Sequence, residues 1–182
     1  MFRALSLLVF KLIGWRVVDH RPAGLKQAIY VVAPHTSNWD FLVGVFARSI
    51  ARLGNARYLA KSSLFKPPFG WIFYALGGYP VDRSKSTHIT DQVAGYFRSI
   101  PDFSIAITPE GTRKHVTQWK TGFWRIAQAA GVPLVPTSFD YARKEITLHA
   151  PRPVGPDMEQ DIAALMAFFK QFKGRRAEHG VR

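Results

Sequence analysis

The sequence has 182 residues, which is enough for one domain with a full core but too few for two comfortable domains. Because 47% of the residues are hydrophobic and 14% are aromatic, a disordered chain is excluded. The absence of cysteine excludes disulfides and thiolate chemistry. The formal net charge of +13 favours an anionic partner, which would be a nucleic acid, a membrane surface or a phosphorylated substrate.

The positive charge is concentrated near the two ends of the chain. Residues 1–81 contain ten Lys or Arg against only two acids, Asp19 and Asp40. Residues 170–182 are also basic, and we interpret them as a solvated face that aids solubility. We expect a single domain over 1–182, with a C-terminal helix and basic tail at 157–182.

Residues 1–15 are mostly apolar and predict an amphipathic helix. Arg3, Ser6, Lys11 and Gly14 fall in one sector, which leaves a wide apolar face. That face consists of Phe2, Leu5, Leu8, Val9, Leu12 and Trp15. The segment is shorter than the ~20 residues of a membrane span, and it lacks the cleavage site of a removed signal peptide. We therefore expect a helix that associates with a membrane surface; packing on the protein's own core is the alternative.

Strand and helix patterns alternate along the rest of the chain. Strands are expected at 29–32, 56–60, 79–81 and 103–108, with a hairpin of 134–142 and 145–150. Helices are expected at 41–50, 87–99 with Thr87 as N-cap, 121–130 and 158–172, together with a helical stretch at 61–74 that is broken by Pro67 and Pro68. This order predicts an α/β fold with a mixed, largely parallel sheet flanked by helices.

A His and an Asp lie where the first of these strands turns into a helix, a place where α/β proteins bind ligands. His35 and Asp40 can meet only if Asp40 reaches back from the first helical turn, which Ser37 or Asn38 would cap. A carboxylate on one imidazole nitrogen leaves the other free to accept a proton, as in a general base. A capped helix start with a surface imidazole is the alternative reading.

Three later turns at 77–83, 108–113 and 119–123 also follow or adjoin strand patterns and carry charged residues. The planar fork of an arginine suits a phosphate group, so Arg83 and Arg113 are candidate phosphate ligands, although each could instead be a surface or ion-pair residue. Gly111 would let the backbone approach a ligand closely. Glu110 would neutralise an arginine or accept a hydrogen bond from a substrate hydroxyl.

Together and in this order, the motifs resemble the glycerolipid acyltransferase family that includes the 1-acyl-glycerol-3-phosphate acyltransferases. The four matching blocks are His-x4-Asp at 35–40, a Gly-rich strand ending in Arg at 78–83, Pro-Glu-Gly-Thr-Arg at 109–113, and Val-Pro-x-x-Pro at 132–136 after Lys-Thr-Gly at 120–122. The resemblance covers about residues 28–140. Pro34 and Thr108 depart from the residues that are common in the family, Asn or Ser and Phe respectively.

The resemblance implies transfer of an acyl group from acyl-CoA or acyl carrier protein to the hydroxyl of a lysophosphatidic acid-type acceptor, in phospholipid biosynthesis. His35 would be the general base and Asp40 its partner. The substrate-binding residues would be Arg83, Glu110, Gly111, Thr112, Arg113 and Lys120. No metal or cofactor is expected, because the thioester itself is the co-substrate. Another lysolipid acceptor is the closest alternative.

The acceptor hydroxyl would attack the thioester directly, so no enzyme nucleophile is required. Ser37 is the nearest candidate for an acyl-enzyme, and backbone N–H groups around Ser37–Trp39 could hold the developing oxyanion.

The expected partners are the thioester donor, the lysophospholipid acceptor and an anionic membrane surface, with a peripheral location on the cytoplasmic face of the cell membrane. The rival classes are a nucleic-acid binder, a lipid-binding relative without catalysis and a metal hydrolase. No nucleic-acid motif is apparent, and the six histidines lack the spacing of metal ligands.

Overall fold

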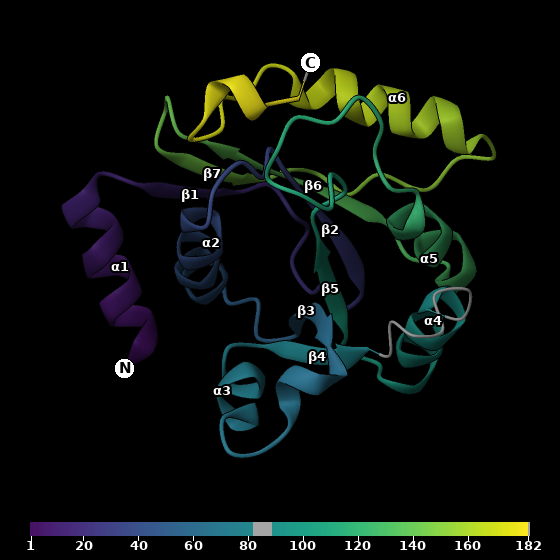
Figure 1. Cartoon of the computed structure of the whole chain (residues 1–182), viewed down its shortest axis with the longest axis horizontal. Helices are drawn as coiled ribbons and strands as arrows, with labels where there is room; N and C mark the ends of the chain where they lie inside the picture. The colour runs from purple at the N-terminus through teal and green to yellow at the C-terminus, as the bar shows by residue number, and fades with distance from the viewer. Residues whose placement is uncertain (82–88, 182) are drawn as a thin grey trace.

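A single sheet of seven strands forms the centre of the computed structural model, which describes residues 1–81 and 89–181 (Figure 1). In sheet order, the strands are β1 (Arg16–Asp19), β7 (Glu145–Leu148), β6 (Leu134–Asp140), β2 (Ala28–Ala33), β5 (Ser104–Ile107), β3 (Ala56–Lys61) and β4 (Gly78–Val81). Every neighbouring pair is parallel except β6 and β7, which form an antiparallel hairpin. The expected mixed, largely parallel sheet in one α/β domain is therefore confirmed.

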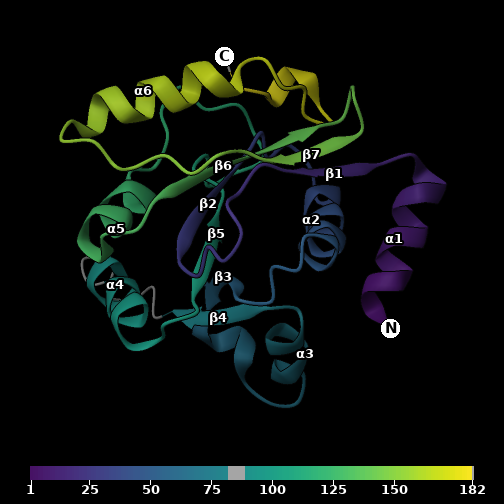
Figure 2. The ribbon, with the colours of Figure 1, turned by 180° about the vertical axis from the view of Figure 1, so that it is seen from behind.

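The central strand β2 is apolar on both faces because helices cover both sides of the sheet. Ile29 and Val31 face a large core formed with α4 (Ile89–Ser99), α5 (Gly122–Ala130) and α6 (Met158–Phe169). Ala28 and Tyr30 point to the opposite side. There, α2 (Trp39–Ile50) packs, with α1 (Phe2–Ile13) outside it (Figures 1 and 2).

A smaller unit closes the β3–β4 edge of the sheet. It consists of the 3₁₀ turn η1 (Ser62–Phe65) and the short helix α3 (Gly70–Ala75), which lie below α2 in Figure 1. Pro67 and Pro68 separate these two pieces, so the expected break in the helical stretch is confirmed. A second 3₁₀ turn, η3 (Ala177–His179), follows α6 near the C-terminus.

Strand β1 was not among the expected elements. Its four residues contain only two apolar side chains, and its position depends on parallel pairing with β7, more than a hundred residues later. The expected ends of the helices agree with the observed ends to within a few residues. As expected, Gly131 ends α5, in a left-handed conformation with φ +67°. The proposed N-cap Thr87 lies outside the described residues.

Helix α1 packs on α2 through one side and exposes apolar residues on the other. Phe10 is buried, and its ring contacts Phe46 of α2 with centroids 6.4 Å apart. Ser6 is buried as well, and its hydroxyl donates to the carbonyl of Phe2 within the helix. On the outward side, Leu5, Leu8 and Leu12 are 51%, 53% and 76% exposed.

Across residues 1–81 and 89–181, none of the helices combines the length and the apolar character that crossing a bilayer requires.

Candidate active site

His35 and Asp40 meet at the turn between β2 and α2. The imidazole Nδ1 of His35 lies 3.0 Å from Oδ2 of Asp40. The His35 side chain is 17% exposed, whereas that of Asp40 is 2% exposed. With Nδ1–H donating to the carboxylate, Nε2 is left to accept a proton, which is the arrangement of a general base. The geometry places His35 on the turn and Asp40 in the first turn of the helix.

Asp40 is the centre of a dense hydrogen-bond network. Its Oδ2 accepts the backbone N–H groups of Thr36 and Ser37 at 2.8 and 2.9 Å. Its Oδ1 accepts the hydroxyls of Ser37 and Tyr141 at 2.9 and 2.6 Å. Burial raises the pKa of Asp40, but the hydrogen bonds from His35, Tyr141 and Ser37 outweigh burial and lower it overall. Asp40 is therefore a fixed carboxylate near neutral pH.

Tyr141 is a component of the site that the sequence analysis missed. It follows directly after β6, and its position in the sequence, 101 residues from Asp40, carries no signal of the contact. The indole ring of Trp15 packs edge-on against its ring with centroids 4.8 Å apart. Burial and the hydrogen bond to Asp40 raise the pKa of Tyr141, so its hydroxyl remains a donor over the physiological range.

The contacts of Ser37 bear on two roles considered for this turn, that of a nucleophile and that of an oxyanion site. The hydroxyl of this buried residue donates to Asp40 and accepts the N–H of Trp39 at 3.2 Å, so it supports the turn and is not poised as a nucleophile. The backbone N–H groups of Ser37 and Trp39 are likewise bound to Asp40 and to the Ser37 hydroxyl. These two N–H groups are therefore already engaged, and an oxyanion site at this turn stays a prediction. Asn38 occupies the N-cap position of α2, but its side chain forms no capping hydrogen bond.

Glu110 joins the Pro-Glu-Gly-Thr-Arg loop to the turn that carries His35 and Asp40. Its Oε1 accepts the backbone N–H of His35 at 2.9 Å, and the residue is 6% exposed. Its other oxygen, Oε2, is buried without a hydrogen-bond partner among the described residues. Burial raises the pKa of this carboxyl group. Glu110 therefore orients His35 through the backbone, whereas its contact with a substrate stays a prediction.

The rest of this loop brings together a glycine and a lysine. Gly111 has a φ of +64°, and a Cβ at this position would lie 2.6 Å from Cε of Lys120, so the lysine side chain crosses directly over it. Lys120 and Arg113 are exposed, and Thr112 accepts the N–H of Lys114 at 3.4 Å. The structure thus places Lys120 beside the loop that holds His35. Arg83 lies outside the described residues.

Comparison with known proteins identifies the family. The family model described as Acyltransferase matches residues 16–140, which include the dyad and the Pro-Glu-Gly-Thr-Arg loop. The chain belongs to this acyltransferase family.

Several bacterial proteins named 1-acyl-sn-glycerol-3-phosphate acyltransferase are similar to this acyltransferase chain. The protein from Escherichia coli K12 is 32% identical over 147 residues, and that from Salmonella typhimurium is 30% identical over 146 residues. Each match covers 76% of this chain, but the chain spans only 58% of the length of either relative.

A solved structure shares the fold. The 1-acyl-sn-glycerophosphate (LPA) acyltransferase PlsC from Thermotoga maritima aligns with a TM-score of 0.57 over 95% of this chain and 80% of its own. At 17% sequence identity, this likeness supports the fold alone.

Proposed function

We propose that this acyltransferase moves an acyl group from a thioester, acyl-CoA or acyl carrier protein, to the hydroxyl of a lysophosphatidic acid-type acceptor. The observation that carries the proposal is the His35–Asp40 pair at 3.0 Å, with Asp40 buried and held by further donors. The similar bacterial proteins, which share the name 1-acyl-sn-glycerol-3-phosphate acyltransferase, also support an acceptor of this kind.

The chemistry uses one proton shuttle. Nε2 of His35 takes the proton of the acceptor hydroxyl as its oxygen attacks the thioester carbonyl carbon. The carbon–sulfur bond then breaks, and the imidazolium returns the proton to the departing thiolate. Asp40 holds the tautomer of His35 and stabilises the imidazolium, and Tyr141 holds Asp40 in turn. The products are the acylated acceptor and the free thiol.

The acceptor phosphate would lie on the basic side of the site. Lys120 and Arg113 supply exposed positive charge from the loop that also holds His35 through Glu110. Arg83 would add to them, and Gly111 and Thr112 would complete the acceptor site. Binding energy from the phosphate would position the hydroxyl against His35, so that remote contacts accelerate the chemical step.

We also propose that the protein lies on an anionic membrane surface, at its cytoplasmic face. Among the described residues, every large apolar side chain that is exposed lies within residues 1–74. These side chains belong to α1, the start of α2, η1 and α3, or to residues directly beside these elements. These elements lie on one side of the molecule in both views (Figures 1 and 2). An apolar face next to basic residues such as Arg3, Lys11 and Lys66 suits an interface between lipid tails and anionic headgroups.

The deciding experiment is a thioester-consumption assay with a panel of acceptors, run with the wild type and with His35→Ala. Acyl-CoA and acyl carrier protein are supplied as alternative donors, and lysophosphatidic acid, a zwitterionic lysophospholipid and monoacylglycerol as alternative acceptors. We expect transfer to lysophosphatidic acid that depends on His35. Failure of the wild type to acylate any acceptor would refute the proposed activity.

A further inference from the structure

The basic C-terminal segment 173–180 lies across the two loops that form the site. At one end, the carbonyl of Lys173 accepts the backbone N–H of Tyr141 at 2.8 Å. In the middle, the backbone N–H of Arg176 donates to the hydroxyl of Thr36 at 3.2 Å. At the other end, the carbonyl of Gly180 lies 3.2 Å from Nδ1 of His115. The segment is thus fixed to the catalytic turn and to the 109–120 loop, and it is not a loosely solvated tail.

A glycine allows the segment to come this close. Gly174 is buried, and a Cβ built on it would lie 2.6 Å from both Oγ1 and Cγ2 of Thr36. Thr36 is itself buried and is the neighbour of His35 in the chain. The backbone next to Arg175 is therefore held against the catalytic turn by direct packing as well as by hydrogen bonds.

Arg175 is positioned by the same turn. Its guanidinium carbon lies 5.0 Å from the ring centroid of Trp39, the residue before Asp40. Stacking on an aromatic face limits the motion of the guanidinium but leaves its N–H groups, which lie at the edges of the plane, available to an anion. Burial and Asp40 raise the pKa of Tyr141, and the nearby positive charge of Arg175 partly offsets this effect.

Arg175 carries a charge that none of the described carboxylates neutralises in an ion pair. The side chain is exposed, and the adjacent Arg176 is exposed as well. An oriented but unpaired guanidinium at the edge of a site for phosphorylated substrates is ready to form paired hydrogen bonds with a phosphate.

We propose that Arg175 binds a phosphate group of a substrate at the edge of the His35–Asp40 site, while its guanidinium stacks on the ring of Trp39. The inference deepens the proposed function and rests on it. Arg175 lies beyond residues 16–140, the range that the family model matches, so the family likeness does not assign this role. The phosphate belongs either to the acceptor or to the donor, since lysophosphatidic acid and coenzyme A both carry phosphate groups.

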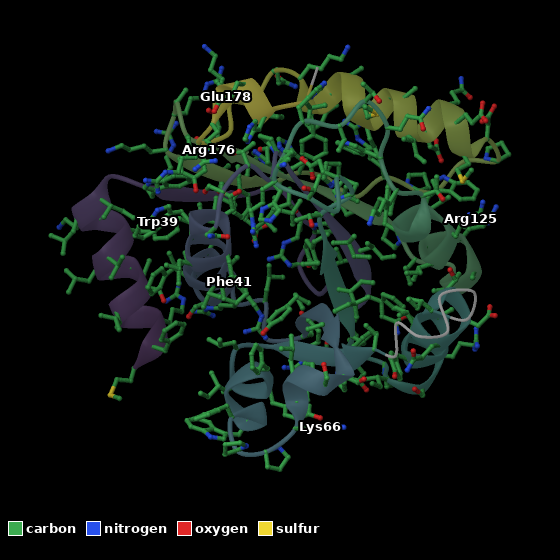
Figure 3. The ribbon with its side chains drawn as sticks, viewed as in Figure 1. Trp39, Phe41, Lys66, Arg125, Arg176 and Glu178 are labelled. Carbon is green, nitrogen blue, oxygen red and sulfur yellow. The ribbon has the colours of Figure 1, made fainter. Side chains whose placement is uncertain are left out.

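The test compares Arg175→Gln with Arg125→Gln, which removes the same charge from an exposed position on α5. Figure 3 shows Arg125 at the end of the molecule opposite Trp39, and Arg176 near Trp39. Calorimetry with the full chain measures binding of two probes, sn-glycerol 3-phosphate and coenzyme A. Steady-state kinetics measure the KM of the lysophosphatidic acid acceptor and of the acyl-CoA donor.

We expect Arg175→Gln to weaken binding of one probe, and to raise the matching KM, by roughly tenfold or more, because it removes charge-assisted hydrogen bonds. A change with glycerol 3-phosphate assigns the phosphate to the acceptor, and a change with coenzyme A assigns it to the donor. Three outcomes would overturn the inference. Arg175→Gln binds both probes as the wild type does, the wild type binds neither probe, or Arg125→Gln loses as much affinity as Arg175→Gln. Probe binding that depends on Arg175 in a protein without transferase activity would refute only the proposed function.

Discussion

The His35–Asp40 turn, proposed here to be catalytic, and the basic side of the site are built in opposite ways. Around Asp40, every described partner is within 3.0 Å and the carboxylate is almost completely buried. By contrast, Arg113, Lys120 and Arg175 are exposed. Proton transfer requires a fixed donor–acceptor geometry, whereas attraction of a phosphate tolerates long, mobile side chains. The difference indicates that changes at the turn should reduce turnover, and changes on the basic side should raise KM.

The largest effect is expected for His35→Ala. Removing the general base should lower kcat roughly 10²–10⁴-fold, with little change in the KM of the acceptor. Circular dichroism should match the wild type, whereas the melting temperature should fall somewhat, because the buried carboxylate of Asp40 loses the hydrogen bond from His35. A large rise in KM with unchanged kcat would place His35 among the binding residues. The turn and the basic side of the site would then no longer differ in which kinetic constant they affect.

Tyr141→Phe tests the support of the catalytic carboxylate. Loss of a hydrogen bond to a charged, buried group should lower the free energy of unfolding by about 1.5–3 kcal/mol and reduce kcat more than it changes KM. Tyr74→Phe, at an exposed tyrosine of α3, is the matched control and should leave both quantities unchanged.

The pH dependence of Tyr141→Phe has a definite sign. The pKa of Asp40 is lowered in the folded protein, so its hydrogen bonds stabilise the fold above the unfolded-state pKa of about 3.9 and are lost as pH falls through the lower folded value. The difference in melting temperature between wild type and Tyr141→Phe should therefore be largest near neutral pH and narrow below about pH 4. A difference that is constant from pH 3 to 7 would contradict the role of Tyr141 as a donor to a carboxylate.

A smaller effect is expected for Gly111→Ala. The new Cβ would displace Lys120, so the KM of the phosphorylated acceptor should rise severalfold while kcat falls little. Backbone strain at positive φ should also cost on the order of 1 kcal/mol of stability. Gly24→Ala is the matched control: its φ is +80°, and no atom lies within 4 Å of the added Cβ. It should share the loss of stability but leave KM unchanged; equal KM changes in both variants would exclude a role for Lys120.

The smallest effect on turnover is expected at the outward face of α1. The double variant Leu8→Ser, Leu12→Ser should reduce sedimentation with anionic liposomes while leaving transfer to a dispersed short-chain acceptor unchanged. Point variants are more informative than deletion of residues 1–14, because deletion would also remove the buried Phe10 from its contact with α2. Unaltered liposome binding would argue that the face has another use.

The sequence predicted the features that depend on local patterns. The apolar run of β2 and the turn after it predict that His35 and Asp40 lie at the end of a strand. Local sequence patterns likewise predict the hairpin of β6 and β7. Other features depend on contacts between distant segments. Tyr141 reaches Asp40 across 101 residues. From its sequence, the C-terminal segment is interpreted as a charged, solvated tail. In the structure, its backbone donates a hydrogen bond to Thr36. Charge counts carry no information on hydrogen bonds of the main chain, so this contact could not be predicted.

The short turn between β6 and β7 serves three parts of the molecule at once. Tyr141 at its start reaches the catalytic carboxylate, and at its end Lys144 binds the carbonyl of Ile13 through Nζ and the N–H of Arg16 through its own carbonyl. A residue inserted or deleted within this turn would move Lys144 away from Ile13 and Arg16. The length of the turn is thus fixed from outside it, by α1 and β1, whereas Arg143 is exposed and pairs within the hairpin itself, with its Nε 3.6 Å from Oδ2 of Asp140.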